Sequence, residues 1–165
     1  MQDEMGITSK NVFACSVKRG IEIYNENCKV FSFLSSSFDS VKVNSICTYR
    51  SSIDNKENDE LLVACEDGSI FQISKYKATK YSQVGYPLTT ISTFKVKQMK
   101  ERLILVGGHF DCLKFYCEQK FLCDLKTSDW VQSIGVGDMD GDGEDELVLG
   151  LLDNNINIYK LQFQN

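Results

Sequence analysis

The sequence predicts an all-β protein built from tandem repeats, and three observations lead to that fold class. Short apolar runs rich in Val, Ile, Phe and Tyr are separated by Gly, Asp and Asn, which is typical of strands and turns. No helical period of 3.6 residues persists for three turns. Three similar tripeptides also recur at a fixed interval, because their last residues, Ala64, Gly107 and Gly150, are each 43 positions apart.

The repeat extends on both sides of these tripeptides. Upstream, Ile91 and Ile134 are again 43 residues apart, and a looser copy around Ala14 opens the chain. Each unit begins with an apolar run, passes through the tripeptide to an alternating hairpin partner, and ends in a more ragged strand such as 120–125. The matching downstream stretches are residues 67–73, 110–116 and 153–159.

Four strands in about 43 residues is the size of a β-propeller blade, for which repeats of about 40–45 residues are typical. A β-sandwich also has short strands at regular spacing, but it has no reason to keep one period of 43 residues. We therefore expect a single partial or minimal β-propeller domain over residues 1–165, with about 3.8 repeats of four antiparallel strands. The expected blades are residues 1–40, 41–84, 85–127 and 128–165.

The strand count is compatible with two kinds of ring. The first and last units each hold three expected strands, whereas the two units between them hold four. Propellers have about four to eight blades, so the chain is either a minimal four-bladed ring or part of a larger one. A partial arc leaves sheet faces and strand edges that must be covered. We favour a fragment, or a subunit whose ring is completed by other protein subunits.

An acidic loop at residues 138–147 predicts a metal site. Carboxylates at alternate positions can converge on Ca²⁺ when glycines let the backbone curl between them. An EF-hand needs a Glu at the twelfth position, which is Leu149 here, and an apolar strand follows instead of a helix. We expect Ca²⁺, or Mg²⁺ in its place, and the alternative is a turn that binds no metal and only starts the strand. The expected ligands are the side chains of Asp138, Asp140, Asp142 and Glu146 and the backbone carbonyl of Glu144.

The loop and the strand after it resemble the FG-GAP repeat of integrin α-chain propellers. The matching pattern is Gly137-Asp138-x-Asp140-Gly-Asp142-Gly-x-x-Glu146-Leu-Val-x-Gly150. In that family the first, third, fifth and ninth loop positions supply side-chain ligands, and Glu146 stands where the family usually has Asp. The intracellular relatives resemble the chain best. These are the FG-GAP subunit of the KICSTOR complex, which supports nutrient control of TORC1, and the propeller subunits of the Bardet–Biedl ciliary coat complex.

Cysteines and charge indicate an intracellular protein. The seven cysteines include no C-x-x-C pair and have no His at zinc-finger spacing, and the chain has no Asn-x-Ser/Thr acceptor. The first ten residues are polar rather than a secretory signal, and no apolar run is long enough to span a bilayer. A net charge of −5 argues against nucleic acid as a partner. We expect a cytoplasmic protein, associated with the cilium or the lysosome through its partners.

These features predict a non-enzymatic scaffold for protein–protein interaction, the propeller subunit of an intracellular multiprotein complex of the nutrient-signalling or ciliary-coat type. One alternative is a calcium-dependent ligand-binding or adhesion propeller of the integrin type, and another is a hydrolase or lyase built on a propeller. His109, Asp111 and Cys112 are the residues that could be drawn as a catalytic set, but no nucleophile motif surrounds them. We therefore expect no catalytic residue and no organic cofactor.

Two other features have both a structural and a functional interpretation. A basic stretch could meet an acidic partner, although a solvated loop face is the commoner explanation. Trp130 begins a strand and could anchor an interface, or it could pack between two blades. The basic stretch consists of Lys95, Lys97, Lys100 and Arg102.

Overall fold

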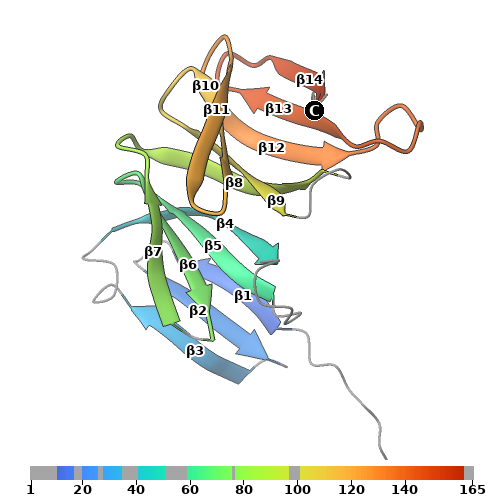
Figure 1. The fold of residues 1–165 in the computed structure, drawn as a ribbon. Helices are drawn as coiled ribbons and strands as arrows, with labels where there is room; N and C mark the ends of the chain where they lie inside the picture. Colours follow the sequence, from blue (N-terminus) through green and yellow to red (C-terminus); the bar gives the residue numbers. More distant parts are fainter. Residues whose placement is uncertain are drawn as a thin grey trace, which may run out of the picture. The chain divides into compact units, whose positions relative to one another are not determined.

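The computed structural model describes residues 11–16, 20–25, 28–34, 41–50, 59–75, 77–96 and 101–161. Within these ranges the regular structure consists of fourteen strands and contains no helix (Figure 1). The described residues therefore contain no helix that could span a membrane. The chain forms two compact units, Met1–Val43 and Asn44–Asn165, and each is described by itself.

The first unit holds one antiparallel sheet with the strand order β1-β2-β3. Its central strand pairs with both neighbours, because Ile21 lies opposite Cys15 on one side and opposite Phe33 on the other. The side chain of Ile21 is fully buried. The strands are β1 (Asn11–Ser16), β2 (Gly20–Asn25) and β3 (Cys28–Leu34).

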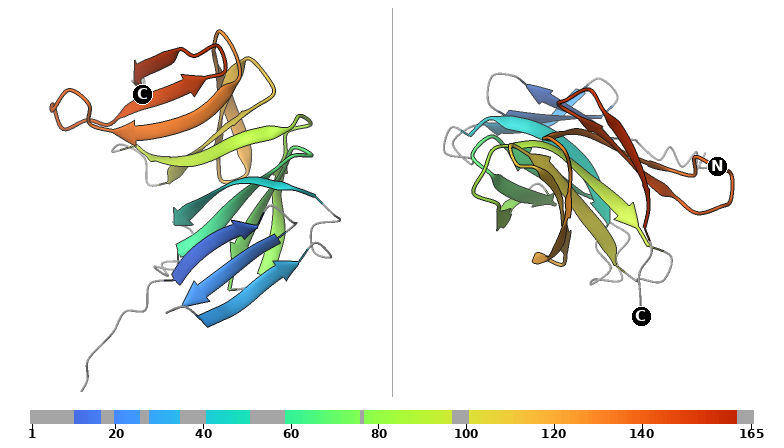
Figure 2. Two further views of the ribbon diagram at one scale, coloured as in Figure 1. Left: turned by 180° about the vertical axis from the view of Figure 1, so that it is seen from behind. Right: turned by 90° about the horizontal axis from the view of Figure 1, so that it is seen from above.

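The second unit contains three further antiparallel sheets, whose succession can be followed from two more directions in Figure 2. The second sheet consists of β4 (Val43–Arg50), β5 (Asp59–Cys65), β6 (Ser69–Ser74) and β7 (Lys77–Gln83). The third sheet consists of β8 (Leu88–Lys95), β9 (Arg102–Gly108), β10 (Cys112–Cys117) and β11 (Lys120–Lys126). The fourth sheet consists of β12 (Val131–Gly137), β13 (Glu146–Leu151) and β14 (Ile156–Lys160).

Strands follow one another in sequence order across each of these sheets, so neighbouring strands are joined by short connections. The first strands of the sheets, β4, β8 and β12, are called the inner strands here. Successive sheets pack through them, because β8 contacts β5 and β12 contacts both β8 and β9. The second and third sheets, with four antiparallel strands each, and the fourth, with three, confirm the predicted all-β class of blade-like units.

The third sheet lies between two hydrophobic cores. Side chains alternate between the two faces of a strand, and on β9 both faces are buried. Ile104 and Val106 enter the core shared with the second sheet, whereas Leu103 and Leu105 enter the core shared with the fourth. This double burial explains why β9 is apolar at consecutive positions instead of alternating with polar residues.

The 43-residue repeat is also present in backbone irregularities and in the carbonyls that accept two cross-sheet hydrogen bonds. A register shift falls between Leu88 and Thr90 in the third sheet, and another falls between the residues 43 positions later, Val131 and Ser133, in the fourth. The carbonyl of Leu88 accepts a hydrogen bond of 2.7 Å from the side chain of Asn44. In the same way, the carbonyl of Val131 accepts one from the Thr89 hydroxyl. Each of these two bonds ties the start of one inner strand to the sheet before it.

Glycine at the third position of the repeated tripeptide has a packing reason. A Cβ atom built on Gly107 would lie 2.8 Å from Cβ of Val131 and 2.9 Å from the Val131 carbonyl oxygen. It would also lie 2.8 Å from Cγ2 of Thr90 in the same sheet. Side chains do not approach that closely, so the fourth sheet can sit on β9 only because residue 107 has no side chain.

We predict that Gly107→Ala lowers the free energy of unfolding by about 1–3 kcal/mol, because the added methyl overpacks the contact with Val131. Chemical denaturation followed by circular dichroism measures this change. The matched control is Gly137→Ala, since a Cβ at Gly137 meets no atom within 4 Å. The control should change stability by less than about 0.5 kcal/mol. Equal losses in both variants would contradict the packing reason.

Candidate metal centre

The acidic loop joins β12 to β13 and projects from the end of the fourth sheet (Figure 1). Two glycines shape it, because Gly141 and Gly143 have φ values of +79° and +84°, which L-amino acids with side chains rarely adopt. Their amides donate to the two oxygens of Asp138, at 2.7 Å from Gly141 and 2.8 Å from Gly143. The loop therefore curls around the Asp138 carboxylate, as expected from the glycine spacing.

Three of the predicted ligands come together. One carboxylate oxygen each from Asp138, Asp140 and Glu146 lie within 4.8 Å of one another. Ca²⁺ binds its oxygen ligands at about 2.3–2.6 Å, so oxygens on opposite sides of the ion are separated by roughly twice that distance. The cluster therefore has the donor chemistry and the spacing of a site for a hard cation such as Ca²⁺.

Glu146 gives this cluster its buried member. It begins β13, is only 4% exposed, and accepts a hydrogen bond of 2.8 Å from the Met139 amide at Oε2. Its other oxygen, Oε1, is buried and has no hydrogen-bond partner. Burying a carboxylate oxygen is costly unless a positive charge lies nearby. A positive charge close to Oε1 would therefore stabilise the buried carboxylate.

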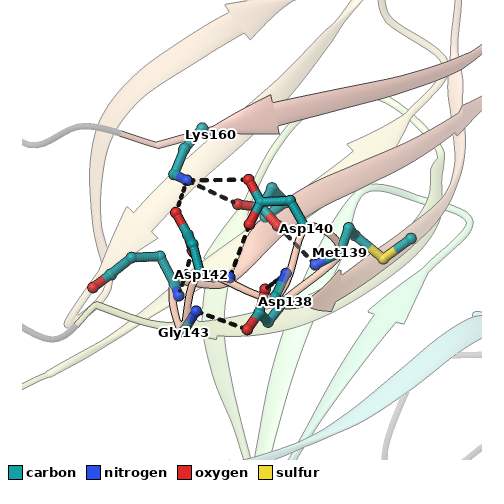
Figure 3. Close-up of polar contacts among 9 residues, drawn as sticks. Asp138, Met139, Asp140, Asp142, Gly143 and Lys160 are labelled. Carbon is teal, nitrogen blue, oxygen red and sulfur yellow. Dashed lines mark hydrogen bonds and ion pairs between the residues drawn. The ribbon is translucent and has the colours of Figure 1, made fainter.

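Lys160 is one source of that positive charge. Its Nζ lies 3.4 Å from Asp140 Oδ2 and 3.6 Å from Glu146 Oε1, and it forms an ion pair with Asp142 (Figure 3). The hydrogen bond to Asp142 raises the pKa of the Lys160 ammonium above its ordinary value, and the same bond lowers the pKa of Asp142. Its ammonium group is thus in contact with two members of the cluster and with Asp142.

The remaining predicted ligands are placed differently. Asp142 lies outside the three-residue cluster, because its carboxylate pairs with Lys160 at one oxygen and accepts the Glu144 amide at the other, at 2.8 Å. Glu144 is exposed, and its backbone amide donates this hydrogen bond to Asp142. Sequence reasoning missed Lys160, although it lies directly opposite Glu146 in the pairing of β13 with β14.

The residues considered as a catalytic set have other surroundings. The ring of His109 stacks on Trp130, with 4.2 Å between ring centroids and 13° between ring planes. Asp111 is exposed, whereas Cys112 is buried, and this burial raises the pKa of its thiol. His109 follows β9 and Trp130 precedes β12, so this ring stack joins the turn after β9 to the start of the fourth sheet.

Several other predicted features can be placed in part. Lys95 is exposed and Arg102 is partly buried, while Lys97 and Lys100 lie outside the described residues. Burial raises the pKa of the Cys47 thiol to about 12, so this thiol stays protonated and unreactive near neutral pH. The cysteines whose side chains are described are all free of disulfides, and they are Cys47, Cys65, Cys112, Cys117 and Cys123.

Comparison with known proteins defines the class of fold, which is that of β-propeller domains. The structure of BBS1N in complex with ARL6DN, from a crystal soaked with lead, matches with a TM-score of 0.64 at 14% identity. That match covers 90% of this chain and 45% of the other. The WD40 β-propeller domain of Doa1 matches with a TM-score of 0.70 at 12% identity, over 95% of this chain and 49% of the other.

A third match is to a protein of similar size. The computationally designed Ika4 protein matches with a TM-score of 0.61 at 11% identity, over 98% of this chain and 100% of the other. By contrast, this chain spans about half the length of the BBS1N and Doa1 chains. At these identities the likeness shows the fold alone. No protein-family model matches the sequence, and no curated protein matches it.

Proposed function

We propose that this chain is a non-enzymatic propeller module for protein–protein interaction. The observation that carries the proposal is the exposure of large apolar side chains on strands and on the turns that join them. Rigid sheets can present such side chains to a partner at little entropic cost. The exposed apolar side chains of the described residues are Tyr86, Phe121, Leu122, Val136, Met139, Leu152, Ile156 and Ile158.

The comparison with BBS1N supports an interaction role, since that propeller was solved in a complex with another protein, ARL6DN. The finer assignment, to a propeller subunit of an intracellular complex of the nutrient-signalling or ciliary-coat type, is supported by the FG-GAP-like loop sequence. The five cysteines whose side chains are described are free thiols, which favours this assignment over a secreted adhesion propeller of the integrin type. The stacking of His109 on Trp130 gives no support to a hydrolase or lyase.

The test is purification of the tagged chain from the cells that express it, followed by sedimentation. We expect it to sediment with other protein subunits in fixed stoichiometry, because an interaction module works as part of an assembly. The matched control is the same tagged chain unfolded before mixing with the lysate, which should recover none of these subunits. A chain that sediments alone as a compact monomer in the same lysate would contradict the proposal.

We also propose that the cluster of Asp138, Asp140 and Glu146 binds Ca²⁺ as a structural ion. The support is the spacing of its three oxygens and the burial of Glu146 Oε1, which has no hydrogen-bond partner. The ion would neutralise the carboxylates and hold the loop between β12 and β13 in one conformation. Lys160 would compete with it, because the ammonium contacts Asp140 and Glu146. Mg²⁺ is the alternative ion for the same oxygens.

Calorimetric titration of the chelator-treated chain tests this site. We expect heat on adding Ca²⁺, at least tenfold weaker binding in Asp140→Asn, and tighter binding in Lys160→Met because the competing ammonium is removed. A parallel titration with Mg²⁺ identifies the preferred ion. Asp153→Asn is the matched control, since Asp153 is an exposed carboxylate bonded to Ser128 outside the cluster. Absence of heat and of any thermal shift in both the parent chain and Lys160→Met would remove the metal proposal.

A further inference from the structure

The acidic loop supplies backbone partners for each of the four carboxylates that the sequence predicts as ligands. Each carboxylate accepts at least one hydrogen bond of 2.7–3.1 Å from an amide of the loop itself. The loop conformation therefore has a set of contacts within the chain that includes no metal ion. The acceptor and donor pairs are Asp138 with Gly141 and Gly143, Asp140 with Asp142, Asp142 with Glu144, and Glu146 with Met139.

The Lys160 ammonium meets the carboxylate oxygens that these amides leave over. Asp140 and Asp142 each accept an amide at Oδ1 and face Lys160 with Oδ2. Glu146 accepts an amide at Oε2 and faces Lys160 with Oε1, at 3.6 Å. Asp138 differs, because both of its oxygens accept amides. Amides and one ammonium thus divide the oxygens of the four carboxylates between them (Figure 3).

Lys160 is delivered to this position by the sheet and not by the loop. It lies on β14, directly opposite Glu146 in the pairing with β13. Strand pairing therefore holds the ammonium near the loop at a high effective concentration. The Lys160 side chain is 43% exposed, so its flexible stem also has a route by which the ammonium can move into water.

A metal ion and the ammonium compete for the same carboxylates. The three oxygens that lie within 4.8 Å of one another come from Asp138, Asp140 and Glu146, and Lys160 contacts the last two of these residues. A divalent cation among these oxygens would repel an ammonium held a few ångströms away. Uptake of the ion therefore requires that Lys160 leave.

We propose that Lys160 is a built-in counter-ion that holds the acidic loop folded in the metal-free chain and is displaced when a divalent cation binds. The inference rests on the proposed metal site and states how that site is regulated. The loop exchanges one cation for another instead of folding around the metal. The ammonium also sets the Ca²⁺ concentration at which the loop loads, since apparent affinity falls with the fraction of molecules whose site is free.

Thermal unfolding of the full chain, followed by circular dichroism, tests the counter-ion role. Lys160→Met keeps a long side chain and removes its charge. In chelator we expect this variant to unfold about 3 °C or more below the parent chain, because the buried Glu146 carboxylate loses its positive neighbour. Saturating Ca²⁺ should raise its unfolding temperature at least about twice as much as that of the parent, which loses the ammonium contact as it gains the ion.

The matched control is Lys120→Met, because Lys120 is exposed on β11, outside the acidic loop and its sheet. This control should follow the parent chain in chelator and in Ca²⁺. A second measurement needs no variant and follows displacement in the parent chain. An amine-reactive ester, with labelled lysines read by mass spectrometry, should modify Lys160 about fivefold or more faster in saturating Ca²⁺ than in chelator. The rate at Lys120 should not change.

Equal unfolding temperatures of Lys160→Met and the parent chain in chelator would overturn the counter-ion role. If calorimetry shows that the parent chain binds Ca²⁺ while labelling of Lys160 stays slow, the exchange is wrong and the metal site stands. If neither chain shows heat or a thermal shift with Ca²⁺, the metal site itself fails and the exchange fails with it.

Discussion

The second unit depends on one contact, in which an inner strand rests on the second strand of the sheet before it. Val131 lies where a side chain on Gly107 would be, so the approach of the two sheets requires that residue 107 have none. Hydrogen bonds from Asn44 to Leu88 and from Thr89 to Val131 fix the start of each inner strand on the preceding sheet. The inner strands that make this packing follow the 43-residue period, because Leu88 begins β8 and Val131 begins β12.

The acidic loop between β12 and β13 and one face of the fourth sheet are linked through Glu146, which begins β13. On the third sheet, one row of the covered face is apolar and includes Phe94 and Leu103. Its counterpart on the fourth sheet is polar, because Glu146 lies opposite Lys160. The buried carboxylate of Glu146 thus belongs both to the metal-type cluster and to the face of the fourth sheet that is turned away from the third sheet. A change in the charge around it would alter both.

Most of the fold could be predicted from the sequence. Local residue patterns, such as the tripeptides ending at Gly107 and Gly150, predict the strands, the turns and the 43-residue repeat. The reason for glycine there could not be predicted, since Val131 meets Gly107 only through packing. At the candidate metal centre, the carboxylates at alternate positions of residues 138–142 predicted a metal-binding loop. The pairing of Asp142 with Lys160 escaped notice because these residues are 18 positions apart and meet across strands. Aligning Glu146 with its neighbour on β14 would have revealed Lys160.

The most direct test of this packing is a nuclear Overhauser measurement on the folded chain in solution. The account predicts a strong cross-peak between the Hα protons of Gly107 and the side-chain protons of Val131. The internal reference is the pairing of Thr90 with Gly107 within the third sheet, which must also give its cross-peak. If the Thr90 to Gly107 cross-peak is present and the Gly107 to Val131 cross-peak is absent, the sheets form but do not pack as blades, and the account is wrong.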